Sequence, residues 1–362
     1  MSVSTPPSPL AETVRTTPTD IWNDSCAVDE LRDAIAHGAT GATANPTIVH
    51  DVWRADPARW RAAVVDLAAT NPTWSERELA WGIVAAMSVE GARLLVPAFE
   101  ASGGRKGRLS VQTDPTLFRD AGAMVEQAAG FDRLAPNIVV KFPTSRAGIR
   151  AMEEASALGI SVNATVSISV AQAVAAAEAV ERGMARRSAA GLETESMGPV
   201  ITLMMGRLED WLRVLTERDG LVVDPDALPW AGVAAFKRAY GIFVERGFRA
   251  RLLGAAIRHH RHWSELIGGD IVLTLPAVWQ RRFNASSIEV RPRIDDPVDP
   301  AVLATLLRVE EFRRAYEPGG LTLDAFDAWG PTARTLRAFV ASYHDLLHAV
   351  SDALVPDPDV RR

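Results

Sequence analysis

Lys141 is the residue whose type and position could do the most distinctive chemistry in this chain. It lies near the end of a short β-branched run, residues 138–143, which is typical of a buried parallel strand and which a proline stops. Burying a lysine costs free energy unless its charge is paired or its pKa falls. A lowered pKa frees the amine lone pair, and a free amine condenses with a carbonyl group to form a Schiff base. A lysine taken alone is usually exposed or ion-paired, so the other residues must decide between these interpretations.

Polar residues also follow nearly every other short apolar run along the chain. In chain order they are Asp24, Asn45, Gln112, Asn163, Thr165, Thr202, Arg207 and Arg258. Each one alone is more often a helix N-cap or a turn residue. In a barrel of alternating strands and helices, however, catalytic groups come from the C-terminal ends of several strands. We therefore expect this set to converge around Lys141.

Four of these residues suit the reacting part of a carbonyl site. Lys141 could attack a ketone or aldehyde. Asp24 could move a proton on a substrate hydroxyl, because a carboxylate can act as a general base at neutral pH. Thr165 and Gln112 could position a water molecule. The set favours imine chemistry on a hydroxylated carbonyl compound.

The remaining five suit substrate binding. Asn45, Asn163 and Thr202 are candidates for binding sugar hydroxyls or the carbinolamine. Arg207 and Arg258 could hold a phosphate through planar, charge-assisted contacts. Such contacts supply binding energy remote from the reacting carbon. The expected partner is a small sugar phosphate or hydroxyketone.

The elements that must position these residues alternate between short apolar strands and amphipathic helices. The predicted strands are residues 20–24, 40–44, 108–112, 138–143, 160–165, 199–204, 249–255 and 270–274. Repeated β-then-α units imply a parallel sheet, and eight of them favour an α/β fold closed into a single (β/α)8 TIM barrel. A doubly wound sheet is the alternative, but the chain has neither a G-x-G-x-x-G after a strand nor a G-x-x-x-x-G-K-[ST] motif.

The segments outside the eight units predict the domain limits. Residues 1–18 are rich in Ser, Thr and Pro and predict a disordered leader. We expect the barrel to occupy residues 19–350, with extra helices after residue 300 that pack across it. Residues 351–362 predict a C-terminal tail.

Composition excludes several classes of protein. The chain has 362 residues and a formal net charge of -6, so it has no broad basic field for nucleic acid. Its single cysteine, Cys26, excludes an internal disulfide and fits a reducing compartment, so we expect a cytoplasmic location. We identify neither a signal peptide nor an uninterrupted apolar run of membrane-spanning length, and expect no membrane partner.

Two histidine pairs have a spacing that could suit metal ligands. His259 and His262 share a helical face, and His344 and His348 lie one turn apart. The first pair has no nearby carboxylate or cysteine in the sequence to complete a site, and the second lacks the glutamate of an H-E-x-x-H motif. We expect a basic helix start near a phosphate at the first pair, helix packing or a surface role at the second, and no metal.

Several segments between about residues 19 and 277 resemble signatures of the transaldolases, class I Schiff-base enzymes of sugar-phosphate metabolism. Residues 43–47 (TANPT) resemble T-x-N-P-[ST], and residues 140–143 (VKFP) resemble the family's lysine strand. Residues 159–165 (GISVNAT), followed by residues 171–173 (AQA), resemble G-I-x-x-N-x-T and A-Q-A. Residues 206–211 (GRLEDW) resemble G-R-[IL]-x-D-W. These segments also occur in the order and with the spacing of the transaldolase signatures, and this makes the resemblance specific.

The resemblance implies roles for the candidate residues. Lys141 would form the Schiff base, and Asp24 would be the acid/base on the C4 hydroxyl during aldol cleavage. Asn45 and Asn163 would bind the dihydroxyacetone portion, and Thr165 would hold the catalytic water. The two candidate arginines would bind the substrate phosphate. The family needs no metal and no organic cofactor, since the lysine imine is the electron sink.

Three residues depart from the family pattern. Gln112 stands where transaldolases usually carry a proton-relaying glutamate. An aldolase branch carries glutamine there and pairs it with a tyrosine. This chain has Met204 at the position of that tyrosine, so it does not match the aldolase branch either. Ala256 replaces a serine that usually helps to bind phosphate. Three hypotheses remain open: a transaldolase-type transferase, a class I aldolase or lyase of the same fold, and a catalytically weak sugar-phosphate-binding barrel. A homodimer is left open for each.

Overall fold

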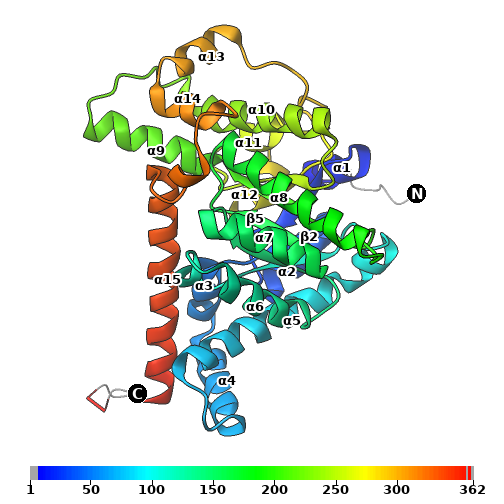
Figure 1. The fold of residues 1–362 in the computed structure, drawn as a ribbon, viewed down its shortest axis with the longest axis vertical. Coiled ribbons are helices and arrows are strands. Elements are labelled where there is room, and N and C mark those ends of the chain that lie inside the picture. The colour runs from blue at the N-terminus through cyan, green and yellow to red at the C-terminus, as the bar shows by residue number, and fades with distance from the viewer. Residues whose placement is uncertain (1–6, 356–357, 360–362) are drawn as a thin grey trace.

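Eight parallel strands close into a barrel in the computed structural model, which describes residues 7–355 and 358–359 (Figure 1). Each strand pairs with the next in chain order, and the last pairs with the first. The strands are β1 (Asp20–Asn23), β2 (Gly41–Thr43), β3 (Arg108–Gln112), β4 (Ile138–Pro143), β5 (Val162–Thr165), β6 (Val200–Met204), β7 (Arg251–Ala255) and β8 (Val272–Leu275). The predicted TIM barrel is confirmed, and every strand end lies within two residues of its expected position.

Helices surround the barrel. They are α1 (Pro9–Thr16), α2 (Val28–Ala36), α3 (Pro46–Ala55), α4 (Pro57–Thr70), α5 (Glu76–Ala101), α6 (Ala121–Asp132), α7 (Arg146–Leu158), α8 (Val170–Ala189), α9 (Met205–Arg218), α10 (Ala231–Arg246), α11 (Arg261–Ser264), α12 (Ala277–Asn284), α13 (Pro300–Leu307), α14 (Glu310–Tyr316) and α15 (Gly330–Leu354). Short 3-10 turns are η1 (Pro115–Leu117), η2 (Leu228–Trp230) and η3 (Leu323–Ala325).

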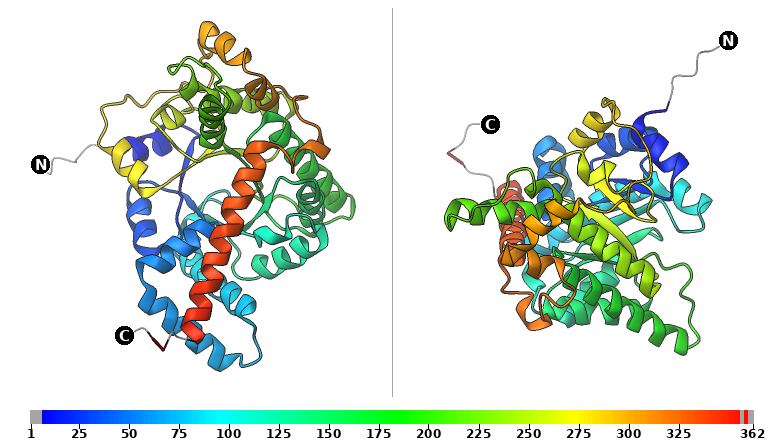
Figure 2. Two further views of the ribbon diagram at one scale, coloured as in Figure 1. Left: turned by 90° about the vertical axis from the view of Figure 1, so that its left-hand side faces the viewer. Right: turned by 90° about the horizontal axis from the view of Figure 1, so that it is seen from above.

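The last helix crosses one mouth of the barrel. In the left view of Figure 2, α15 (red) lies over the strands, and it packs against α3, α4, α5 and α9. Proline at the start of α15 suits the first helical turn, where a backbone N–H has no helical partner. The expectation that late helices pack across the barrel is therefore confirmed.

Strand register aligns three of the candidate polar residues. Lys141 of β4 pairs with Gln112 of β3 on one side and with Asn163 of β5 on the other. Side chains alternate between the two faces of a strand, so residues paired in register point to the same face. All three side chains are therefore at one level on the same face of the sheet.

The predicted leader is wrong for residues 9–16, which form α1. Ser8 caps this helix by accepting a hydrogen bond from the Ala11 N–H, and Leu10 is buried. The Leu10 N–H also bonds to the side chain of Asn284 in α12. The apolar Leu10 anchors a segment whose composition suggests disorder. Residues 1–6 lie outside the described part of the chain.

The predicted tail also begins too early. Helix α15 continues through Leu354, and the backbone N–H of Val355 caps it by bonding to the Ser351 carbonyl. The buried Val350 holds the last turns against the molecule. The end of the predicted tail, residues 360–362, lies outside the described residues.

Within the described residues, one helix, α5, is long and apolar enough to cross a membrane by length and composition. It opens with a capping box, in which Ser75 and Glu78 bond reciprocally. Half of its most apolar window is buried inside the molecule, where α5 packs on β3 and α4. A core helix of a barrel has the same composition, so α5 is weak evidence for a membrane span.

Candidate active site

A cavity of about 190 Å³ lies at the barrel mouth where the strands end. Its lining includes the predicted residues Asp24, Asn45, Lys141, Thr165, Thr202, Arg207 and Arg258. Phe339 of α15 also lines it, so the crossing helix closes the cavity from above. The predicted residues Gln112 and Asn163 do not line the cavity but flank Lys141 in register.

Lys141 is almost completely enclosed, with 5% of its surface exposed. Its Nζ donates a hydrogen bond to the Ala44 carbonyl oxygen at 3.2 Å. Burial lowers the pKa of Lys141 to about 8, and the nearby Asp24 carboxylate limits the fall. At pH 7 roughly a tenth of such amines are neutral, against well under a thousandth for an ordinary lysine. An amine with this pKa is neutral often enough near pH 7 to attack a carbonyl carbon.

Asp24 directly follows β1, and a chain of hydroxyl groups orients it. Its Oδ1 accepts a hydrogen bond from Thr43 Oγ1 at 2.6 Å, and Thr43 Oγ1 lies 2.7 Å from Thr274 Oγ1. Because an ionised carboxylate only accepts, Thr43 must donate to Asp24 and Thr274 must donate to Thr43. Burial raises the pKa of Asp24, while Lys141 and the Thr43 hydrogen bond oppose the rise. A carboxylate held in this way can exchange a proton with a bound substrate.

Two asparagines have different places. Asn45 caps α3 by accepting the Ile48 N–H through Oδ1 at 3.0 Å, which leaves its amide NH2 for the cavity. Asn163 is fully buried, and both of its polar atoms bond to protein: Nδ2 donates to Ser110 and Oδ1 accepts from Thr202. Asn45 thus has a free donor, whereas Asn163 serves as a buried link beside Lys141.

Gln112 and Thr165 offer polar groups beside Lys141 that are largely uncommitted. Gln112 Oε1 is buried and has no hydrogen-bond partner in the described part of the chain. Thr165 Oγ1 makes one weak contact, with Met204 Sδ at 4.0 Å. Because a buried unsatisfied polar atom is costly, Gln112 Oε1, which does not line the cavity, suits a buried water molecule, whereas Thr165 Oγ1 can also meet a substrate hydroxyl.

Two arginines bring positive charge to the other side of the cavity. Arg207 stands at the start of α9; burial and the neighbouring Arg258 lower its pKa, and its Nε has no partner among the described residues. Arg258 is held by both oxygens of Asp210, at 3.1 and 2.7 Å. Asp210 pairs with Arg258, whereas Arg207 has no carboxylate in ion-pair contact among the described residues, so the two guanidinium groups leave an excess of positive charge that suits a dianionic phosphate.

The loop that carries Arg258 is strained and tightly packed. Ala256 has φ of 60°, in the left-handed region that disfavours residues other than glycine. Its carbonyl oxygen would lie 2.0 Å from a Cβ placed on Gly206, so only glycine fits at the start of α9. The predicted departure at Ala256 thus lies where β7 and α9 meet.

A buried carboxylate supports the same loop. Glu209 accepts hydrogen bonds from the Nε2 atoms of His262 at 2.7 Å and His259 at 3.1 Å. Burial alone would raise the pKa of Glu209, but these two histidines lower it to about 2. The sequence interpretation that no carboxylate lies near this pair is wrong, because α9 and α11 meet only in the fold.

The same cluster has the residue types of a metal site. One ligand atom from each of Glu209, His259 and His262 lies within 4.8 Å of the others. The hydrogen bonds favour another role. His262 Nδ1 accepts the backbone N–H of Arg258 at 3.2 Å, so its Nε2 carries the proton that is donated to Glu209. A protonated nitrogen has no lone pair for a metal. Glu209 and His262 therefore hold the backbone of Arg258, while Asp210 holds its side chain.

Glu209→Gln should raise the KM for a phosphorylated substrate about tenfold and leave kcat nearly unchanged, because it weakens a charge-assisted link behind Arg258. Steady-state kinetics with a phosphorylated substrate and its unphosphorylated analogue checks this. The KM for the analogue should not change. Glu178→Gln, which removes a surface pair with Arg246, is the matched control. Equal effects on both substrates would show a general loss of structure instead.

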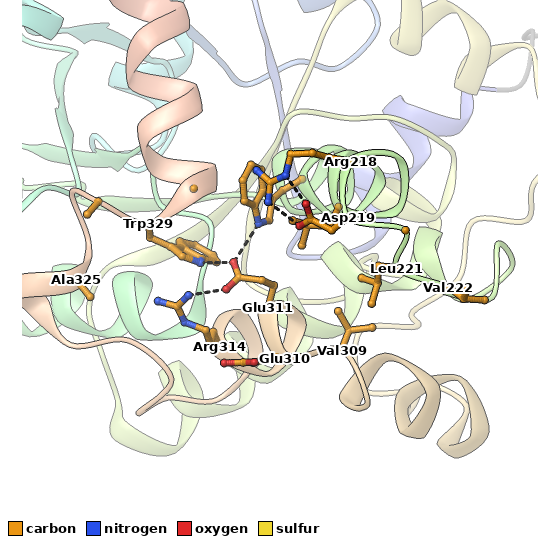
Figure 3. Close-up of a pocket in the computed structure, with 15 residues that line it drawn as sticks. Arg218, Asp219, Leu221, Val222, Val309, Glu310, Glu311, Arg314, Ala325 and Trp329 are labelled. Carbon is orange, nitrogen blue, oxygen red and sulfur yellow. Dashed lines mark hydrogen bonds and ion pairs between the residues drawn. The ribbon is translucent and has the colours of Figure 1, made fainter.

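A second, larger cavity of about 700 Å³ lies outside the barrel, between α9, α14 and the start of α15 (Figure 3). Glu311 accepts hydrogen bonds there from Trp329 Nε1 at 2.9 Å and Trp211 Nε1 at 3.0 Å, and it pairs with Arg314. The lining contains no lysine. Glu311 instead links α9, which carries Arg207, to the start of the helix that closes the catalytic cavity.

The sequence interpretation missed several functional neighbours. Thr43 lies inside a quoted motif but was given no role, and Thr274 lies in a predicted strand without a distinctive pattern. Phe339 follows the last strand by more than sixty residues, and only the packing of α15 brings it to the cavity. Glu209 stands at the variable position of a quoted motif.

Comparison with known proteins agrees with this geometry. Residues 21–349 match the family described as Transaldolase/Fructose-6-phosphate aldolase. The chain is 29% identical over 356 residues to the Transaldolase of Thiobacillus denitrificans, covering 90% of this chain and 95% of that protein. It is 31% identical over 183 residues to Transaldolase 1 of Streptomyces avermitilis (49% of this chain, 47% of that protein), and 30% identical over 200 residues to the Transaldolase of Neisseria gonorrhoeae (53% and 56%). Because the family match spans most of its length, the chain belongs to the transaldolase/fructose-6-phosphate aldolase family.

Proposed function

We propose that this protein is a transaldolase-type transferase, which moves a dihydroxyacetone-type ketol unit between sugar phosphates through an imine on Lys141. The observation that carries the proposal is a buried lysine of lowered pKa that shares one cavity with Asp24 and two arginines. The family match and relatives named transaldolase favour this function over a free aldolase and over a barrel that only binds sugar phosphate.

The proposed reaction balances without a metal or an organic cofactor. Lys141 Nζ attacks the C2 carbonyl of the donor ketose phosphate, and loss of water gives a protonated imine. Asp24 takes the proton of the C4 hydroxyl, the C3–C4 bond breaks, and the aldehyde leaves. The electron pair of that bond moves toward the imine nitrogen and forms an enamine. An acceptor aldehyde then reforms the bond, Asp24 returns the proton, and water hydrolyses the new imine.

We further propose that the remaining residues bind and orient the substrate. Arg207 and Arg258 bind the phosphate, and this remote binding energy places the reacting carbon against Lys141. The free amide of Asn45 bonds a hydroxyl of the three-carbon unit. Thr165, with Gln112 behind it, orients the water that attacks the imine. Asn163 and Thr202 keep the floor of the cavity rigid through their mutual hydrogen bond.

The acceptor dependence of turnover tests the proposal. A purified enzyme is supplied with a ketose phosphate, with and without an aldehyde phosphate, and the products are identified by mass spectrometry. If the protein is a transferase, sustained turnover should appear only when the aldehyde phosphate is present as the acceptor. Release of a free three-carbon ketone without an acceptor would identify an aldolase. If no member of a broad panel of ketoses, ketose phosphates and hydroxyketones reacts, only the binding role would remain.

Gln112→Glu should raise transferase turnover about tenfold, because a carboxylate can accept and return a proton during imine hydrolysis whereas an amide cannot. Single-turnover measurement of product release would locate the gain in the hydrolysis step. Gln112→Met keeps the volume but removes both polar groups, and should lower turnover. Unchanged rates in both variants would mean that Gln112 does not contact the reacting water.

We also propose a cytoplasmic location and a single catalytic unit, which extends beyond the predicted residues 19–350 to include α1 and the end of α15. The buried, unpaired thiol of Cys26 suits a reducing compartment. A homodimer is the assembly to test, by light scattering of the purified protein.

A further inference from the structure

The opposite mouth of the barrel, where the strands begin, holds a cavity of about 270 Å³ that no step above uses. Its lining includes the residues that open three strands, Arg108, Val200 and Arg251. The loop residues 103–105 and 195–199 complete it. This face of a TIM barrel usually serves stability, so its polar groups need an explanation.

Arg108 is the unusual charge in this cavity. It is 3% exposed, and burial lowers its pKa to about 10. Its guanidinium donates to three neutral oxygens: the Gly104 carbonyl at 2.7 Å, the Ser196 carbonyl at 2.6 Å and Ser161 Oγ at 3.3 Å. Among the described residues it has no carboxylate within 4.0 Å. The Asp132 carboxylate opposes the fall in the Arg108 pKa only from beyond contact distance. A buried cation without a carboxylate in contact is costly, so Arg108 suits an external anion.

Trp22 supplies a second donor without a partner. It is 1% exposed, it lines the same cavity, and its indole N–H has no hydrogen-bond acceptor in the described chain. Strand register places Trp22 beside Gly41 and Gly41 beside Arg108. A Cβ on Gly41 would lie 2.5 Å from Trp22 Nε1, so the indole N–H edge lies over the glycine, toward the strand of Arg108. Two donors thus border one space that no side chain of β2 fills.

The other cations of this cavity already have carboxylate partners. The pairs are Arg105 with Asp270, Arg249 with Glu181, and Arg251 with Asp20 and Asp270. Glu195 also lines the cavity, but it is exposed at the rim. The unmatched positive charge is therefore concentrated on Arg108, at the buried end.

We propose that this cavity is a second anion site, which binds inorganic phosphate or a phosphate monoester between the Arg108 guanidinium and the Trp22 indole N–H. A phosphate oxygen accepts from both donors and neutralises the buried cation. The site is separate from the catalytic cavity and does not depend on the proposed activity. Its occupancy stabilises the folded barrel, since a ligand that binds only the folded state stabilises it.

The test must exclude phosphate bound by the catalytic arginines, so it uses the Arg207→Ala/Arg258→Ala protein. The thermal unfolding midpoint is measured against inorganic phosphate, glycerol phosphate and sodium chloride at matched ionic strength. In parallel, 5-fluorotryptophan is incorporated, and the Trp22 fluorine resonance is assigned through Trp22→Phe. We expect a saturable rise in the midpoint with either phosphate compound and a shift of the Trp22 resonance at the same concentrations. The tighter of the two compounds identifies the source of the phosphate group.

Two variants decide whether this cavity is responsible. Trp22→Phe should weaken the affinity about tenfold, because it removes one hydrogen bond to a charged ligand. Arg108→Met should abolish saturable binding. Trp263→Phe is the matched control, because that buried indole already donates to Thr13 Oγ1 and lies outside this cavity. An unaltered affinity in Trp22→Phe, or a response that never saturates and follows ionic strength alone, overturns the proposal even if Arg108→Met does not fold.

Discussion

Lys141→Met should reduce turnover by roughly four to six orders of magnitude, because it removes the only nucleophile of the proposed reaction while keeping a side chain of similar length. Borohydride added with a ketose phosphate should leave a reduced adduct on the Lys141 peptide of the wild-type protein and none in the variant. Mass mapping of the peptides checks both statements. In the wild type, the labelling rate should rise with pH up to about 8, because the attacking amine must be neutral and the pKa of Lys141 is about 8.

The chain offers a matched control for this change. It contains only two other lysines, Lys106 and Lys237. Lys237 also has a pKa lowered by burial, but it donates to the carbonyl oxygens of Arg293 and Asp296, both at 2.6 Å, and it lies outside the catalytic cavity. Lys237→Met should therefore keep its activity and its adduct on Lys141. Labelling of Lys106 or Lys237 in the Lys141→Met protein would show that the imine forms elsewhere.

Asp24→Asn should separate imine formation from carbon–carbon cleavage. The amide oxygen still accepts the Thr43 hydrogen bond, so the geometry survives, but an amide does not take the proton of the C4 hydroxyl. We expect turnover to fall about 10²- to 10⁴-fold while borohydride still labels Lys141. Rapid-quench measurement of aldehyde release, together with the extent of labelling, distinguishes the two steps.

Asp20→Asn is the control at the other end of the same strand. Asp20 is buried and pairs with Lys106 at 2.9 Å and Arg251 at 2.8 Å. Its loss should lower the free energy of unfolding, since it leaves buried cations less compensated, and should change turnover little. If Asp24→Asn retains near wild-type turnover, another group takes the proton and the assignment of Asp24 fails.

The barrel could be predicted because its strands are local features of the sequence. Each apolar run is bounded by turn residues, and the helix ends have strong signals, such as the left-handed Gly159 that ends α7. Helix α1 was not predicted because two buried residues, Leu10 and Thr13, outweigh a composition that resembles a disordered segment. Local composition does not reveal which single side chain finds a buried position.

The candidate site was predictable to the extent that its residues lie at strand ends. Asp24, Asn45 and Lys141 follow this rule, and the fold brings them into one cavity. Contacts between distant segments were not predictable. Glu209 and His262 are 53 positions apart, and α15 reaches the cavity from far along the chain. These contacts depend on how helices pack outside the barrel, which the strand pattern does not encode.

The position of α15 in the chain has a consequence for biosynthesis. Because Gly330 follows all eight strands, the ribosome completes every strand before it makes the helix that covers the mouth. Domains tend to fold from the N-terminus during translation. A nascent chain with a closed barrel would therefore carry Lys141 and Asp24 in a site open to cellular aldehydes and water until α15 emerges and docks. The barrel can therefore fold before Lys141 is shielded, because shielding must wait for the final helix.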